Sequence, residues 1–396
     1  MADGKQSALL APALVPRLVS CPVTAPATTY LVTGFPSWIA RAVVREIAHE
    51  TEGALVHLLV PQDRAEEAAA FCRELRALAS PVRVLPGDAV RMDLGLPGRE
   101  YVALARDVDV LVNLYDVSAL PDDGTSSYGG LYGKLGDPVD LTQRAAQEAL
   151  EFAATSSHIR HLIQLGSLTV AGGFDGVWTE EDLSAGQQHR SSAERARHRT
   201  ERLLWRARDR FPFTILRVGP VLGDSRTGEI GWYHGPWDLL EALLLAPPAS
   251  PWSRSVPPAA LHVVPSDHLA RMVRLLSEAA PERSGALHLA PPTPVPLVQI
   301  REALRVAGPG RLPRTLRGRL RKRWGTGAAA VARSLARIDT PAACSTRRAL
   351  EVERRHGIVH PRFADYVGHL VTHAQARVAA EAQRLAEAGI EDALDG

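Results

Sequence analysis

The chain has 396 residues, of which 45% are hydrophobic and 23% are charged, and its formal net charge at pH 7 is +2. These values are typical of a globular protein with one large domain or two smaller ones. The small net charge argues against a dedicated nucleic-acid-binding protein. The three cysteines form no CxxC pair, so the sequence predicts neither a disulfide framework nor a metal site. We therefore expect a cytoplasmic protein.

The first 27 residues are predicted to be a flexible tail. The stretch LVSC, residues 18–21, resembles a lipoprotein cleavage box. Arg17 stands directly before that box, and Asp3 dilutes the positive charge that a secretion signal needs at its start. No apolar run approaches the length of a membrane span. Both observations favour the tail over a secretion signal.

From residue 28 onward, strand-like and helix-like segments alternate along the chain. Strands are predicted at residues 28–34, 54–60, 82–86, 108–115, 159–167, 213–219 and 286–290. Helices are predicted between them, at residues 39–50, 64–79 and 141–155 among others. This alternation is typical of βαβ units, whose strands form a parallel sheet.

The later part of the chain has a different character. Two proline-rich stretches, residues 243–261 and 290–297, indicate loops. After residue 308 the strand signal fades, and an arginine-rich tail with a helical pattern follows. Within it, residues 311–324 carry apolar side chains at four-residue spacing with arginines between them. Such a helix could contact an anionic membrane surface or a phosphate-bearing ligand. A solvated helix docked by its apolar stripe is the favoured interpretation.

Five stretches of the sequence resemble motifs of one known family. They are TGFPSWIA (33–40), PGDAVRMDLGL (86–96), LRVGPVLGDSRTGEI (216–230), VVPSDHLA (263–270) and GIVHPRFADYVGHLV (357–371). Together they resemble the extended short-chain dehydrogenase/reductase superfamily, in the branch of fatty acyl-CoA reductases, male-sterility proteins and thioester reductases. The resemblance spans roughly residues 28–375.

The resemblance implies a fold and a domain organisation. The fold is α/β, a Rossmann-like doubly wound parallel sheet with a smaller, mostly helical C-terminal region that binds substrate. An NAD(P)-binding domain over residues 28–308 would carry substrate-region insertions at about 225–262. A helical, basic C-terminal region would follow over residues 309–396.

The resemblance also implies a cofactor site, for NADP or NAD. Its residues would be Thr33, Gly34, Ser37, Trp38, Ile39, Ala40, Asp88 near the adenine, and Val218. A glycine-rich turn lets backbone amides at a helix N-terminus approach a pyrophosphate. Here only Gly34 keeps its glycine, whereas Ser37 and Ala40 replace the second and third. We therefore expect cofactor binding to be weak or lost.

The catalytic positions implied by the resemblance have also changed. Ser167 stands at the family's serine position, but the Tyr-x-x-x-Lys pair falls on Ala193 and Arg197. No tyrosine occurs between Tyr132 and Tyr233, and the only lysines are at positions 5, 134 and 322. Alanine has no proton to donate, and arginine is a poor acid. Asp140 replaces the family's asparagine, and Tyr115 and Asp116 replace small residues after the fourth strand. The vacated crevice is therefore either filled passively or repurposed.

Three functions remain open from the sequence. The favoured one is a degenerate, reductase-inactive member that binds a partner protein or an acyl or nucleotide ligand. The second is an NAD(P)H-dependent reductase of acyl thioesters or long-chain carbonyls, with Tyr128 or Tyr132 as an unforeseen proton donor. The third is a non-redox lyase or isomerase that uses Asp140 and Ser167.

Overall fold

The computed structural model describes residues 28–75, 80–115, 138–231, 260–307 and 343–387. The predicted N-terminal tail, most of the predicted insertion, and the basic helix at 311–324 lie outside these ranges. So do Asp116, Tyr128 and Tyr132. The predicted domain boundaries stay predictions.

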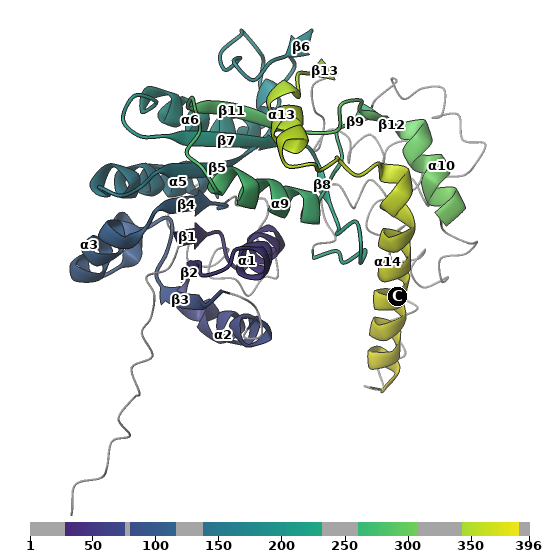
Figure 1. The fold of residues 1–396 in the computed structure, drawn as a ribbon. Helices are drawn as coiled ribbons and strands as arrows, with labels where there is room; N and C mark the ends of the chain where they lie inside the picture. Colours follow the sequence, from purple (N-terminus) through teal and green to yellow (C-terminus); the bar gives the residue numbers. More distant parts are fainter. Residues whose placement is uncertain (1–27, 76–79, 116–137, 232–259, 308–342, 388–396) are drawn as a thin grey trace, which may run out of the picture.

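A parallel sheet of seven strands forms the centre of the fold (Figure 1). Its strand order is β11-β7-β5-β4-β1-β2-β3, and every neighbouring pair is parallel. The strands are β1 (Thr29–Thr33), β2 (Leu55–Val60), β3 (Val82–Pro86), β4 (Val110–Asn113), β5 (His161–Ser167), β7 (Phe213–Val218) and β11 (Gly285–Leu289). This order is that of a doubly wound Rossmann-like sheet. It confirms the predicted fold class.

Helices cover both faces of the sheet (Figure 1). One hydrophobic cluster joins the sheet to α1 (Trp38–Glu50), α2 (Ala65–Glu74), α9 (Ser266–Ser277) and α13 (Arg347–Arg355). A second cluster joins the opposite face to α3 (Gly98–Asp107), α5 (Pro138–Thr155) and α6 (Ser192–Arg206). The strands read as continuous apolar runs because both of their faces are buried.

The C-terminal part adds two helices beside the sheet. The helix α10 (Leu297–Ala307) packs against α14 (Phe363–Glu387), which Figure 1 shows as a long helix at the side of the molecule. Apolar side chains of both helices are buried, among them Ile300, Leu304 and Leu370. None of the described helices is both long enough and apolar enough to cross a membrane.

Short elements connect these layers. They are the 3-10 turns η1 (Gln62–Arg64), η2 (Met92–Gly95) and η5 (Leu168–Ala171), and the short strands β6 (Val177–Trp178), β8 (Val221–Leu222), β9 (Ala260–Leu261), β10 (Val264–Pro265), β12 (Val295–Pro296) and β13 (Ala343–Cys344). The strand β13 corrects the prediction that strands end near residue 308. It pairs in parallel with β6. A strand of two residues is too short to produce a periodic hydrophobic pattern, so it could not be predicted from the sequence.

A fully buried arginine joins four segments of the fold. The side chain of Arg217 on β7, with its guanidinium group, is completely buried. Its Nε and Nη2 atoms donate to the carboxylate of Glu201 on α6, at 2.9 and 2.7 Å. The remaining N–H groups point to the carbonyl oxygens of Thr179 and Asp182 and to Nε2 of His288 on β11. All five guanidinium N–H donors therefore have an acceptor. These hydrogen bonds offset the free energy that is needed to remove the charge from water.

The acceptor role of His288 fixes its tautomer. Its Nε2 faces Arg217 at 3.1 Å, so its Nδ1 carries the proton and donates to the Ser345 carbonyl at 2.8 Å. Burial, reinforced by the Arg217 charge, holds the pKa of His288 well below its usual value. The ring is therefore neutral, and it links β7 to the start of α13.

The buried Glu201–Arg217 pair gives the first prediction. The substitution Glu201→Gln leaves the Arg217 charge buried without a counter-charge, so we expect the free energy of unfolding to fall by about 3–5 kcal/mol. Urea unfolding followed by circular dichroism measures this change. The matched control is Arg362→Met, which removes an exposed ion pair with Asp365 and should leave the urea midpoint unchanged. Equal effects of the two substitutions would contradict the central role of the buried pair.

Candidate functional site

The candidate site lies at the C-terminal ends of β1 and β4, the neighbouring strands between which the strand order reverses. In open α/β sheets this switch point is the usual ligand crevice. Thr33, Asn113 and Gln164 stand side by side in the register of β1, β4 and β5. Thr33 Oγ1 donates to Asn113 Oδ1 at 2.5 Å, and Asn113 Nδ2 donates to Gln164 Oε1 at 2.8 Å. A buried hydrogen-bonded row therefore joins the C-terminal ends of these three strands.

The turn after β1 retains its first glycine for a steric reason. Gly34 has a φ of +94°, and a Cβ at this position would lie 2.7 Å from the carbonyl carbon and oxygen of Leu114. Any side chain would therefore collide with the backbone after β4. The prediction that Gly34 makes the tight turn agrees with this geometry.

Ser37 acts on the helix end where a pyrophosphate would bind. Ser37 is the N-cap of α1, and its Oγ accepts a hydrogen bond from the Ala40 amide at 3.2 Å. The side chain is buried, at 1% exposure. A dinucleotide phosphate relies on just such amides at a helix N-terminus. The serine hydroxyl therefore competes with an anion for one of the donors.

The residues of α1 that follow Ser37 are tightly packed against their surroundings. Trp38 lies directly against residue 231, where a Cβ on Gly231 would come within 2.2 Å of the Trp38 Cβ. Ile39 and Ala40 point into the hydrophobic cluster under α1. The Ala40 methyl group is completely buried, so alanine at this position still permits close packing of helix and sheet.

Asp88, predicted near the adenine, lies in a tightly held loop after β3. Its amide donates to the Leu94 carbonyl at 2.7 Å, and its Oδ1 accepts from the Val90 amide at 3.1 Å. Its Oδ2 lies 3.5 Å from Arg91 Nε. Asp93 and Leu94 both have positive φ, at 54° and 57°, which is uncommon for residues other than glycine. Internal hydrogen bonds therefore hold the loop, and the Asp88 carboxylate is bound to Val90 and Arg91 within it.

The predicted catalytic serine and arginine meet through a third residue. Thr169, in η5 directly after β5, donates from its Oγ1 to Ser167 Oγ at 3.0 Å. Arg197 Nη1 on α6 donates to the same Thr169 Oγ1 at 3.1 Å. Ala193 lies one turn earlier on the same helix. Thr169 was missed by the sequence reasoning, although its place two residues after Ser167 was a usable signal.

The other predicted residues lie at different depths. Val218 ends β7 in register with Ser167 and is buried. Tyr115 follows β4 and packs in the cluster under α3 and α5, at 1% exposure. Such burial agrees with the expectation that an aromatic ring fills space here. Asp140 lies in the first turn of α5, and its side chain is outside the described part. Its catalytic role stays a prediction.

No protein-family model and no curated protein sequence matches the chain. Solved structures do resemble its fold. The terminal R domain from the myxalamid PKS-NRPS biosynthetic pathway superposes with a TM-score of 0.67 at 18% identity, covering 91% of this chain and 96% of that one. The reductase (R) domain of a non-ribosomal peptide synthetase from Mycobacterium tuberculosis gives 0.64 at 18% identity, with coverages of 88% and 92%.

A nucleotide-sugar protein shares the fold as well. MoeE5, in complex with UDP-glucuronic acid and NAD, gives a TM-score of 0.52 at 16% identity and covers 89% of this chain and 99% of its own. At such low identities the similarity concerns the fold alone. The chain therefore has the Rossmann-like α/β fold of these reductase domains, as predicted.

The capping role of Ser37 gives the second prediction. Ser37→Ala removes the acceptor of the Ala40 amide, so we expect the free energy of unfolding to fall by about 1 kcal/mol. Ser37→Gly is the matched control, because glycine at an N-cap costs only about a few tenths of a kcal/mol. Urea unfolding of both variants measures the difference. Equal stability of the alanine variant and the unchanged protein would contradict the cap.

Proposed function

We propose that this chain is a reductase-inactive protein of the short-chain dehydrogenase/reductase fold that acts by binding. The observation that carries the proposal is the pairing of Arg197 with Thr169 beside Ser167, one helical turn from Ala193. A reductase of this fold needs a phenol and an ammonium group at the two helix positions. The chain offers a methyl group and a guanidinium instead.

The physical cost of this exchange is large. A positioned general acid contributes about 10²- to 10⁴-fold to the rate of such a reaction. A methyl group cannot supply a proton, and a guanidinium keeps its proton at any physiological pH. Tyr30, Tyr101, Tyr115 and Tyr366 are the tyrosines of the described residues, and all four are buried in the core. None of these four takes the place that Ala193 occupies on α6.

The phosphate loop supports the same proposal. The Ala40 amide is already bonded to Ser37, and Trp38 lies against residue 231. These contacts fit a nicotinamide dinucleotide poorly, since its pyrophosphate would have to displace the serine hydroxyl. The ligand class that we propose is therefore a partner protein, or an acyl or nucleotide group bound without hydride transfer.

One observation favours a second candidate. The chain superposes over 91% of its length on a terminal R domain, so the scaffold of a thioester reductase is present throughout. In that case an NAD(P)H-dependent reduction of acyl thioesters would need a proton donor other than residue 193. Tyr128 and Tyr132 lie outside the described residues and stay candidates for that role.

Cofactor affinity gives the third prediction. We expect no saturable binding of NADPH or NADH to the purified full chain at concentrations up to about 1 mM, which corresponds to a binding free energy weaker than about −4 kcal/mol. Isothermal titration calorimetry measures the affinity, and energy transfer from the protein's tryptophans to the reduced nicotinamide provides a second signal. A micromolar dissociation constant would revive the reductase candidate.

Restoring the lost groups gives the fourth prediction. A variant with Ser37→Gly, Ala40→Gly, Ala193→Tyr and Arg197→Lys should gain NADPH-dependent reduction of a long-chain aldehyde. The matched control replaces Ala193→Tyr by Ala193→Phe, so the two variants differ by one hydroxyl group. We expect the tyrosine variant to be about 10²- to 10⁴-fold faster, measured by the loss of NADPH absorbance. Equal rates with tyrosine and phenylalanine would contradict the assignment of residue 193. Turnover by the unaltered chain at the restored rate would contradict the proposed inactivity.

A further inference from the structure

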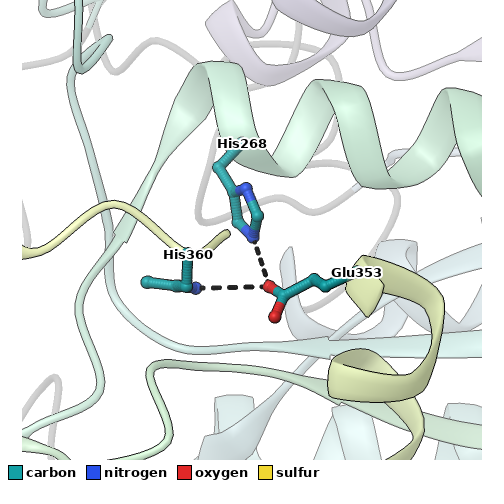
Figure 2. A group of neighbouring side chains, drawn as sticks. All are labelled: His268, Glu353 and His360. Carbon is teal, nitrogen blue, oxygen red and sulfur yellow. Dashed lines mark hydrogen bonds and ion pairs between the residues drawn. The ribbon is translucent and has the colours of Figure 1, made fainter. Parts of the chain in front are cut away.

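Three buried side chains that commonly bind metals converge at one point of the fold. They are His268 from α9, Glu353 from α13 and His360 from the segment that leads to α14 (Figure 2). One ligand atom from each lies within 4.8 Å of the other two. The residues are 85 and 7 positions apart along the chain, so no sequence motif brings them together.

The orientation of His360 suits a ligand. Its Nε2 lies 3.2 Å from the Val263 carbonyl and donates its proton there. Its Nδ1 therefore holds a free lone pair, which points towards Glu353 (Figure 2). This nitrogen is buried and has no hydrogen-bond partner. Metal-bound histidines usually have this arrangement, with the second ring nitrogen held by a backbone carbonyl.

A buried imidazole nitrogen without a hydrogen-bond partner costs free energy, because it has lost its contact with water and gained none in the protein. A metal ion bound at His360 Nδ1 would remove this cost.

The two distances from the imidazole nitrogens to Glu353 are close to those of a tetrahedral metal site. At metal–ligand bonds of 2.0–2.1 Å, two ligand atoms in tetrahedral geometry lie about 3.4 Å apart. His268 Nε2 lies 2.8 Å from Glu353 Oε1, and His360 Nδ1 lies 3.9 Å from the same oxygen. Shifts of about half an ångström would bring both distances to the tetrahedral value. The protein then fills three of the four tetrahedral positions, and a water molecule can fill the fourth.

We propose that His268 Nε2, His360 Nδ1 and the Glu353 carboxylate bind one divalent transition-metal ion of the zinc class. Two imidazoles and one carboxylate favour zinc, cobalt or nickel over magnesium or calcium, which prefer oxygen ligands alone. The ion ties α13 and the start of α14 to α9, and thereby to the sheet. Its role is therefore structural, and it is independent of the proposed binding function.

The alternative is a metal-free hydrogen bond between His268 and Glu353, with His360 packed edge to face against His268 at 4.7 Å between ring centroids. This arrangement explains the burial of His268 and Glu353. It leaves the His360 Nδ1 atom without a partner, and for this reason the metal site is preferred.

Metal binding by the full chain gives the fifth prediction. The purified protein is stripped with a chelator and titrated with Co(II), whose visible absorption intensifies in a tetrahedral site. We expect one Co(II) per chain, displaced by one Zn(II), with the zinc content confirmed by mass spectrometry. Zn(II) should also raise the melting temperature, since it binds the folded state. Absence of both ions at stoichiometric concentrations would overturn the proposal.

Variants tie the ion to these residues. Glu353→Gln and His360→Asn should each weaken Zn(II) affinity about 100-fold or more. His356→Asn is the matched control, because His356 is an exposed histidine four residues before His360 and its loss should leave the affinity unchanged. Equal affinity in all three variants would place the ion elsewhere and overturn the assignment. If a ligand variant does not fold, proton NMR of the Co(II)-loaded unaltered protein decides, since two shifted imidazole spin systems are expected and none would contradict the site.

Discussion

The guanidinium of Arg217 is the constraint on which the rest of the fold depends. A buried charge is tolerated only when every polar group around it is paired. Here five N–H donors select acceptors from α6, from the loop around residues 179–182 and from β11. Through His288 the same network reaches the Ser345 carbonyl before α13. Sheet, helix layer and C-terminal region are therefore positioned by one side chain.

Glu180 extends this positioning to the C-terminal region. Its buried carboxylate accepts from the His288 amide and from the Arg348 amide in the first turn of α13. A carboxylate at a helix N-terminus is favourable, because the helix dipole and the unpaired amides both attract it. Burial raises the pKa of Glu180, and the two amides oppose that effect. The start of α13 is thus fixed to β11 and to the segment after β6.

The loop of residues 223–229 fastens the same region from the other side. Its Ser225 amide and hydroxyl both donate to the Asp267 carboxylate on α9. The Ser225 carbonyl accepts from His369 on α14, and a Cβ on Gly228 would lie 2.0 Å from the His369 carbonyl oxygen. The GDSRTGE loop, residues 223–229, therefore connects α9 to α14 through hydrogen bonds.

The strands of the sheet and helices such as α1 could be predicted from the sequence, because each produces a pattern of apolar residues within its own segment. The predicted strand at 213–219 and the helix at 39–50 match β7 and α1 within one residue at each end. The contacts between distant segments could not be predicted. Thr33, Asn113 and Gln164 meet only because three strands share a register, and His268 meets Glu353 only because α13 docks beside α9. No pattern or spacing in the sequence predicts such contacts between distant residues.

The helix α6 carries both the buried pair of the fold and two residues of the candidate site. Ala193, Arg197 and Glu201 follow one another at four-residue spacing, so they share one stripe of the helix. The inner end of that stripe pairs with Arg217, where replacing the carboxylate would leave a buried charge and cost several kcal/mol. The outer end holds Ala193 and Arg197, which are only half-buried, and Arg197 contacts Thr169. Substitutions there affect chemistry and leave the buried pair intact. A scaffold held together at Glu201 can therefore accept different residues at positions 193 and 197 and still keep its shape.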